Sequence, residues 1–268
     1  KTMNFKELEI FLNKITGWRI PGADCAIYYK NQPVFRYSTG YADIKERKPV
    51  ARDNLYHLYS ATKVITCVAA LQLFEKGYFL MTDPVYEYLP EFKEMYIQKK
   101  GEDNNKELVK ARNYIKVQDL FTMTAGLTYD MNTPFIRYEK ERTQGRCPTR
   151  EVIKAIAKSP LLFEPGTRWN YSLCHDVLAG LVEVISGEKF SAYLSENIFE
   201  PLEMKDTGFY LTEEKQKRMA KQYKFVESTS KVIEIPLANA YAIGSEYESG
   251  GAGLISSADD YIKFANCL

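Results

Sequence analysis

A serine and a lysine stand three residues apart at the start of an apolar segment, as Ser60 and Lys63. Residues at that spacing share one face of a helix, so the hydroxyl and the amine can come within hydrogen-bond reach. A serine hydroxyl is a weak nucleophile until a base takes its proton, and a buried, partly neutral lysine can be that base. The spacing therefore predicts a serine nucleophile with a lysine base. A helix cap followed by a lysine that reaches solvent explains the same pattern about equally well.

Two further segments match Ser-x-x-Lys, at residues 186–189 and 228–231. A glycine ends a helix inside the first segment, and the second lies in a polar stretch typical of a turn. Neither opens an apolar helix, whereas residues 59–74 carry no charge apart from Lys63. Helix context therefore favours Ser60 and Lys63.

A Ser-His-Asp triad is the competing catalytic hypothesis, and it would draw on His57, or on His175 with Asp176. The chain has no G-x-S-x-G elbow, and packing on a helix explains His175 adequately. With two histidines, no H-E-x-x-H and no Cys/His cluster, no metal site is expected. The glycine-rich residues 250–253 lack a phosphate-loop pattern, so they predict close backbone packing and no cofactor.

Composition limits the classes of partner. The 268 residues are 45% hydrophobic, enough for one large domain or two closely packed ones. Thirty-six basic and thirty-five acidic residues leave a net charge of +1, which favours a small-molecule or peptide substrate over nucleic acid or an anionic membrane. The sequence contains no run of eighteen apolar residues, so no transmembrane segment is expected. It does not indicate an oligomeric state.

Cysteine usage bears on the compartment. The five cysteines include no C-x-x-C pair, and several lie in apolar segments, so reduced thiols in the core are expected. Together with the lack of a signal-like N-terminus, they favour a cytoplasmic protein. A leader removed ahead of the sequence would leave the compartment open.

Hydrophobic periodicity and turn residues predict helices together with two β-hairpins. The first hairpin, with strands at 23–30 and 33–41 and a turn at 31–32, is expected to pack with the Ser60 helix. The charge-rich residues 99–110 are expected to form a solvated loop. The remaining predicted elements are helices at 5–16, 59–74, 117–123, 150–157, 172–186 (capped by Ser172 and followed by Gly187), 190–199 and 257–268, and a hairpin of strands 223–226 and 232–235.

The Ser60 helix is one of several segments whose order and spacing are informative together. They read SATK at 60–63, DPV at 83–85 with LPEF at 89–92, LFTMTAGL at 120–127, FEPGT at 163–167, YSL at 171–173, PLEM at 201–204 and GGAGL at 250–254. In this order they resemble the serine β-lactamase and penicillin-binding-protein superfamily, particularly its class C β-lactamase and esterase branch. The resemblance implies an α+β, β-lactamase/transpeptidase-like fold, in which an antiparallel sheet flanked by helices adjoins a mostly helical subdomain. Residues 1–268 would form one domain, its sheet part from about 1–60 and its helical part from about 60–268.

In this branch the second motif is Tyr-x-Asn, whose tyrosine shares proton transfer with the lysine. Tyr171 matches it, but Leu173 stands in place of the asparagine and cannot offer amide hydrogen bonds. Similar Tyr-Ser-Leu versions occur among esterase-like members, so the resemblance implies Ser60, Lys63 and Tyr171 as catalytic residues and argues against an efficient β-lactamase. A Ser-x-Asn match at residues 195–197 lies inside a predicted helix and in the wrong family segment.

The third family motif, Lys-[Ser/Thr]-Gly or His-x-Gly on a strand, has no match before Leu268. The resemblance therefore implies that the family's C-terminal helix and last three sheet strands are missing from a truncated chain. The first hairpin would keep an open edge. The oxyanion hole would hold the Ser60 N–H without its second donor, a loss that costs on the order of a hundredfold or more in rate.

The leading hypothesis from the sequence is a serine hydrolase that forms an acyl-enzyme with an ester, β-lactam or D-alanyl peptide carbonyl. The alternative is a catalytically impaired penicillin-binding or sensor-type protein of the same fold, which Leu173 and the missing strands suggest. The sequence does not choose among these substrates, because the loops that set specificity carry no readable code.

Overall fold

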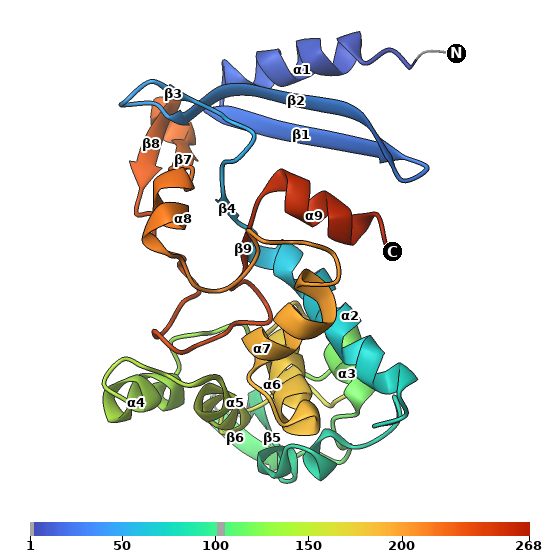
Figure 1. Ribbon diagram of the computed structural model, residues 1–268. Helices are drawn as coiled ribbons and strands as arrows, with labels where there is room; N and C mark the ends of the chain where they lie inside the picture. The colour runs from blue at the N-terminus through green and yellow to red at the C-terminus, as the bar shows by residue number, and fades with distance from the viewer. Residues whose placement is uncertain (1–2, 101–104) are drawn as a thin grey trace. The chain divides into compact units, whose positions relative to one another are not determined.

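The computed structural model describes residues 3–100 and 105–268. It combines helices with small antiparallel sheets, an α+β composition (Figure 1). The chain divides into two compact units. Unit 1 comprises Lys1–His57, Ile198–Ala238 and Ile255–Leu268, and unit 2 comprises Leu58–Asn197 and Asn239–Leu254.

The first hairpin of unit 1 is part of a three-stranded antiparallel sheet of β1 (Gly22–Tyr29), β2 (Gln32–Asp43) and β3 (Lys48–Pro49). The predicted hairpin is confirmed, but its turn lies one residue earlier than expected, at Lys30 and Asn31. Their φ angles of 50° and 61° are the pair of positive values that a tight two-residue turn needs to match the twist of its strands.

Alternation along β2 gives this sheet two different faces. Tyr37 bonds to Asn13 of α1 (Lys6–Thr16), and Phe35 packs on Phe5, the residue just before this helix. The predicted N-terminal helix is confirmed. Arg36, on the opposite face, reaches α9 (Ala258–Ala265). The sheet of unit 1 therefore lies between α1 and α9, as Figure 1 shows.

Unit 1 also contains the second predicted hairpin, which is confirmed, and a short strand pair next to a small apolar core of Leu55, Met219 and Ile255. A helix that the sequence did not predict precedes the hairpin, and Thr212 caps it by accepting a hydrogen bond from Lys215 N–H. The elements are β4 (Tyr56–His57) paired with β9 (Ile255–Ser256), α8 (Glu213–Arg218), and the hairpin β7 (Gln222–Val226) and β8 (Lys231–Ile235).

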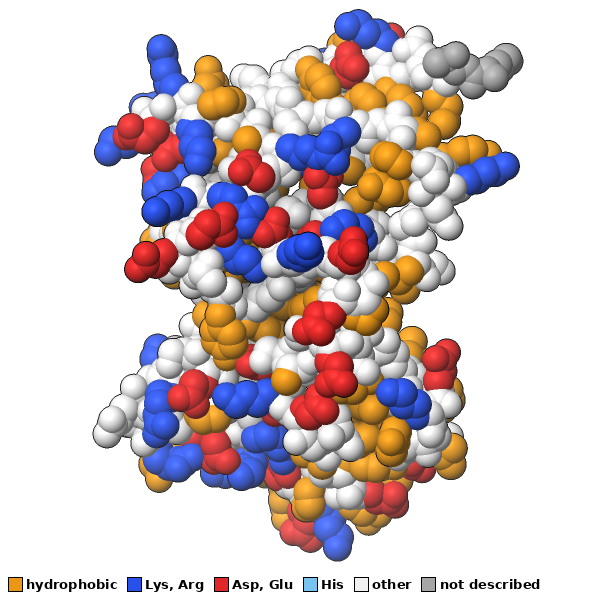
Figure 2. Space-filling model, in the orientation of Figure 1, with side chains coloured by type: hydrophobic (Ala, Val, Ile, Leu, Met, Phe, Trp, Pro, Cys, Tyr) orange, Lys and Arg blue, Asp and Glu red, His pale blue; other side chains and the backbone are white. Residues whose placement is uncertain are grey.

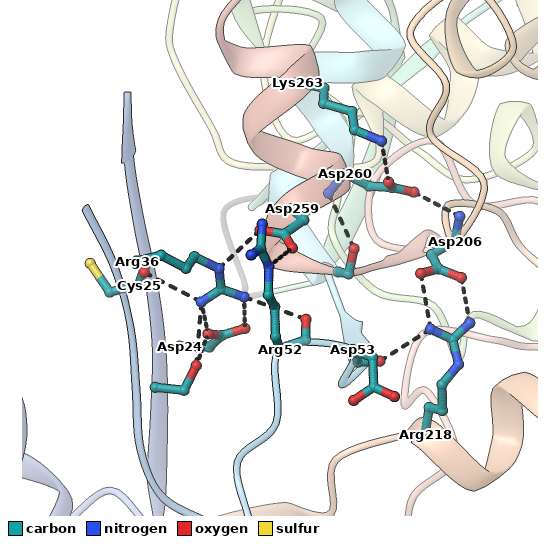
Figure 3. Close-up of polar contacts among 12 residues, drawn as sticks. Asp24, Cys25, Arg36, Arg52, Asp53, Asp206, Arg218, Asp259, Asp260 and Lys263 are labelled. Atoms are coloured by element: carbon teal, nitrogen blue, oxygen red, sulfur yellow. Dashed lines mark hydrogen bonds and ion pairs between the residues drawn. The ribbon is translucent and has the colours of Figure 1, made fainter. Parts of the chain in front are cut away.

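A network of charged side chains joins the sheet of unit 1 to α9 (Figure 3). Arg36 bonds to both carboxylate oxygens of Asp24 and, through Nε at 2.9 Å, to Asp259. The side chain of Asp24 is 3% exposed, whereas Arg52, which also binds Asp259, is 69% exposed. The hydrogen bonds that Arg36 donates to the Asp24 carboxylate raise the pKa of Arg36. The Arg36–Asp24 pair is therefore largely removed from solvent, whereas the Arg52–Asp259 pair is not.

Replacing Asp24 by asparagine should lower the free energy of unfolding by about 3 kcal/mol, because it leaves the Arg36 guanidinium with reduced charge compensation in a mostly buried site. Arg52→Gln removes a solvent-exposed partner of the same network and should change stability by less than about 1 kcal/mol. Urea unfolding of both variants measures the difference. Equal losses would show that burial does not distinguish the two pairs.

The helices of unit 2 form its core, with α2 (Thr62–Glu75) lying against α6 (Cys174–Ser186). Helix α6 ends as predicted at Gly187, whose φ of 76° suits a glycine. Ser172 does not cap this helix, because the N-cap position falls on Leu173. The other helices are α3 (Val117–Thr122), the unpredicted α4 (Pro134–Arg142), α5 (Thr149–Ala157) and α7 (Phe190–Leu194), which continues as a π turn over Ser195–Phe199.

Part of the predicted charged loop at 99–110 is a hairpin, which corrects that expectation. Strands β5 (Tyr96–Lys100) and β6 (Lys106–Lys110) pair antiparallel, with Ile97 opposite Val109. Ile97 is 4% exposed, so one apolar face of the hairpin is anchored although charged residues dominate its composition. Residues 101–104 of the predicted loop lie outside the described residues.

Charge on the surface is mixed in sign. The face drawn in Figure 2 shows acidic and basic side chains interspersed, in line with the net charge of +1. Within residues 3–100 and 105–268, no helix is both long and apolar enough to span a bilayer. All five cysteines are free thiols; Cys147 and Cys174 are buried, and Cys267 is exposed, so the expected core setting holds only for some of them.

Candidate active site

Ser60 lies in a 3₁₀ turn, Tyr59–Ala61, that leads directly into α2. Tyr59 has a φ of 45°, an uncommon backbone conformation for a residue other than glycine. Two hydrogen bonds hold this turn in place: Leu58 N–H donates to Leu254 O at 2.9 Å, and Leu254 N–H donates to the Thr62 hydroxyl at 3.2 Å. The start of α2 is thereby fixed to the glycine-rich segment 188 or more residues away in the chain.

Lys63 is 6% exposed, and its amine has polar and aromatic partners. Nζ donates to Gly251 O at 2.6 Å and lies 3.4 Å from Ser60 Oγ. It also lies 4.8 Å from the ring centroid of Tyr171 and 5.6 Å from that of Tyr129. These contacts offset the cost of burying an ammonium group and direct it toward the serine. Lys63 is thus not a solvent-reaching side chain beyond a helix cap.

Tyr171 comes from the loop that precedes α6, and its hydroxyl donates to Ser60 Oγ at 2.6 Å. Partial burial raises the pKa of Tyr171, but hydrogen bonds with Lys63 and Ser60 and the charge of Lys63 outweigh burial, so that the pKa is below its ordinary value. The structure therefore brings together Ser60, Lys63 and Tyr171. A tyrosine with a lowered pKa in contact with a serine can accept the proton of that hydroxyl.

Aromatic rings extend from Tyr171 around the serine. The ring centroid of Tyr129 lies 5.2 Å from that of Tyr171 and 5.8 Å from that of Tyr241. The centroid of Tyr241 in turn lies 5.8 Å from that of Tyr59. Trp169, 6.4 Å from Tyr171, is 66% exposed. The sequence analysis did not single out Tyr129 or Tyr241. Nothing but the position of Tyr129 just after a family segment distinguished it among twenty tyrosines.

The triad hypothesis is not supported by the contacts of its members. Nε2 of His175 lies 3.2 Å from Phe121 O and 3.6 Å from Cys67 Sγ, and burial lowers the pKa of His175. Asp176 instead accepts hydrogen bonds from other hydroxyls, described below. Nε2 of His57 lies 2.7 Å from a backbone carbonyl, Leu237 O.

The structure also places Leu173 and the Ser-x-Asn match of residues 195–197. Leu173 is 2% exposed and is a core residue at the start of α6. The Ser-x-Asn match lies in the π turn, where the Asn197 side-chain amide donates to Tyr193 O and the Asn197 backbone carbonyl accepts from the Gln72 side-chain amide. Among the described residues, no group of three or more His, Cys, Asp or Glu side chains is arranged to hold a metal ion.

Gly250 and Gly251 are packed closely against both helices, which confirms the predicted role of these glycines. A Cβ on Gly251 would lie 2.5 Å from Asp176 Oδ2, and one on Gly250 would lie 2.4 Å from His175 O. The segment can approach α2 and α6 only because these side chains are absent. This approach places the Gly251 carbonyl on Lys63.

Gly251→Ala should lower stability by about 1–3 kcal/mol and slow the reaction of Ser60 with a fluorophosphonate, because the added methyl group displaces Asp176 or the carbonyl on Lys63. Gly208→Ala is the matched control, since no atom lies within 4 Å of its added Cβ. Thermal unfolding and labelling with a fluorophosphonate measure the two effects. An alanine at 251 with wild-type stability would contradict the tight packing.

A family model described as Beta-lactamase matches residues 13–268. The chain belongs to this family. The family predicted from the sequence motifs is thereby confirmed. Among curated relatives, the chain is 29% identical over 251 residues to Protein Rv1367c of Mycobacterium tuberculosis, covering 93% of this chain and 62% of that protein. It is also 29% identical to Esterase EstB of Burkholderia gladioli, covering 95% of this chain and 67% of the esterase.

The solved structure of simvastatin synthase (LovD) from Aspergillus terreus matches 98% of this chain and 67% of its own, at 27% identity and a TM-score of 0.79. The β-lactamase/transpeptidase-like α+β fold is thus confirmed. The chain spans 62% of the length of the mycobacterial relative.

Proposed function

We propose that the protein is a serine hydrolase that forms an acyl-enzyme on Ser60 with carboxylic ester substrates. The position of the Ser60 hydroxyl, 2.6 Å from Tyr171 Oη and 3.4 Å from Lys63 Nζ, is the observation that carries this proposal. A nucleophile within hydrogen-bond reach of a base, which a third group orients, is the arrangement that covalent catalysis requires.

In the proposed reaction, Ser60 Oγ attacks the ester carbonyl carbon while its proton passes to deprotonated Tyr171. The Lys63 ammonium stabilises the negative charge on that tyrosine. Tyr171 then gives the proton to the departing alcohol as the ester C–O bond breaks, leaving an ester between the acyl group and Ser60. Water repeats the sequence, with its proton taken by Tyr171, and releases the carboxylic acid.

Three observations support esters as the substrates rather than β-lactams. Leu173 is buried where the family motif has an amide, so this position provides no hydrogen bond to a substrate side-chain amide or to the lysine. The relatives include proteins named Esterase EstB and Lovastatin esterase, the second 28% identical over 264 residues. The exposed rings beside Ser60 also suit an apolar acyl or alcohol group.

The test compares three reagents on the purified protein. A fluorophosphonate should add one phosphonyl group to Ser60, identified by peptide mass spectrometry, and p-nitrophenyl butyrate should be hydrolysed at least roughly tenfold faster than a chromogenic cephalosporin. Absence of a Ser60 adduct, or a preference for the cephalosporin, would contradict the proposal.

The penicillin-binding or sensor function is the second candidate, and the buried Leu173 favours it because a leucine lacks the amide that would hold the lysine for turnover. Its signature is different. Labelled penicillin would remain on Ser60 for hours without ester turnover. Rapid hydrolysis of p-nitrophenyl butyrate would exclude this second candidate.

A further inference from the structure

Asp176, on α6, is a buried carboxylate that the reaction above does not use, and it is 2% exposed. Its Oδ1 accepts hydrogen bonds from Tyr247 Oη at 2.6 Å and from Ser249 Oγ at 2.6 Å, with Gly251 N–H at 3.4 Å. A buried carboxylate without hydrogen-bond partners is strongly unfavourable, and these three donors supply the partners that its burial requires. Every one of these donors comes from the glycine-rich segment and the residues just before it.

Gly251 connects this carboxylate to the lysine of the active site. Its N–H points to Asp176, and its C=O accepts from Lys63 Nζ at 2.6 Å. The neighbouring Gly250 O accepts from the Thr66 hydroxyl at 2.7 Å, one turn along α2 from Lys63. Gly251 thus directs its N–H toward the Asp176 carboxylate and its carbonyl toward the Lys63 ammonium, and both charges favour this orientation of the backbone.

We propose that Asp176 is a positioning residue for Lys63, acting through the backbone of Gly251, in the acylation of Ser60. The inference rests on the proposed function, because it assumes that Lys63 and Tyr171 act on Ser60. The family motif would place an amide at position 173 to hold the lysine, and a buried leucine cannot do so. In this chain the carboxylate of Asp176, three residues further along α6, positions the lysine indirectly. It bonds to the N–H of Gly251, whose carbonyl accepts from Lys63.

Asp176 also acts on the site through its charge. Its negative charge raises the pKa of Tyr171, opposing the larger lowering by Lys63 and Ser60. Removing that charge should therefore lower the pKa of Tyr171 and move the pH midpoint of acylation to lower pH. The other titratable groups around Tyr171 and Asp176 come from several elements. They are Lys63 and Cys67 on α2, His175 on α6, and the tyrosines Tyr129, Tyr241 and Tyr247 of the neighbouring loops.

The test is Asp176→Asn, which keeps the shape of the side chain and removes its charge. The maximal rate of ester acylation should fall about 10- to 100-fold. A loss of this size is expected when a reacting group, here the Lys63 amine, is misplaced by up to about 1 Å. KM for the ester should stay within about threefold, and the pH midpoint should move to lower pH. A variant with wild-type maximal rate and pH midpoint would overturn the inference.

A matched control separates positioning from general loss of stability. Glu139, 6% exposed on α4 and bonded to Arg142, is also a buried carboxylate of unit 2. Glu139→Gln should lower the melting temperature but leave the acylation rate within about twofold and the pH midpoint unchanged. If both variants lose rate equally and neither shifts the midpoint, Asp176 is structural and the inference is wrong.

Single-donor variants keep the inference testable if Asp176→Asn does not fold. Ser249→Ala and Tyr247→Phe each remove one hydrogen bond to Asp176 and leave its charge in place. Folded forms of both should acylate several-fold more slowly than wild type, and wild-type rates in both would contradict the inference. Failure of the wild-type protein to form a Ser60 adduct would instead reject the proposed function, so the two failures are distinguishable.

Discussion

Replacing Ser60 by alanine should abolish covalent labelling and reduce ester hydrolysis by at least roughly a thousandfold, because the variant has no oxygen to carry the acyl group. Residual turnover would come from binding and from polarisation of the substrate by the remaining groups. Intact-protein mass spectrometry after fluorophosphonate treatment, with the rate of p-nitrophenyl butyrate hydrolysis, measures both effects.

The chain contains its own controls for this substitution. Ser186 and Ser228 are the serines of the other two Ser-x-x-Lys matches, but Ser186 donates to Val182 O inside α6, and Ser228 is exposed at the β7–β8 turn. Ser186→Ala and Ser228→Ala should retain wild-type labelling. Labelling that persists in Ser60→Ala and disappears in either control would show that the nucleophile has been misassigned.

Replacing Tyr171 by phenylalanine should lower the acylation rate by about 10² to 10⁴, the range expected when a positioned general base is removed. It should also change the pH profile. Because the pKa of Tyr171 is lowered in the protein, the deprotonated form that accepts the serine proton is present above that pKa and is lost as pH falls through it. The wild-type rate should therefore fall toward acidic pH, and the phenylalanine variant should lack this limb.

Tyr138→Phe serves as the matched control, since Tyr138 is 59% exposed on α4. It should reproduce both the wild-type rate and the wild-type pH profile. A Tyr171→Phe variant with the same acidic limb as wild type would assign that limb to another group. A rate loss smaller than about tenfold would place the proton transfer elsewhere, with Lys63 as the remaining candidate in contact with Ser60.

Several parts of the fold were predictable from the sequence because they depend on neighbours in the chain. The helix that joins Ser60 to Lys63 follows from an uncharged apolar run, and the end of α6 follows from Gly187, which takes up a φ of 76°. Both hairpins were predicted from alternation and turn residues. The β5–β6 hairpin was not predicted, because most of its residues are charged and only one face of it is buried. Ile97 lies on that buried face.

The sequence by itself determined the family, the nucleophile and lysine pair as a hypothesis, and the helix that carries the pair, since all of these are readable in local order and spacing. Tertiary structure alone decided what surrounds that pair. Tyr171 reaches Ser60 across 111 residues, and Gly251 reaches Lys63 across 188, so no local pattern specifies either contact. The same holds for Asp176, which looked like a possible triad acid in sequence. Folding turns its carboxylate toward Tyr247 and Ser249, because a buried charge is stable only where donors converge on it.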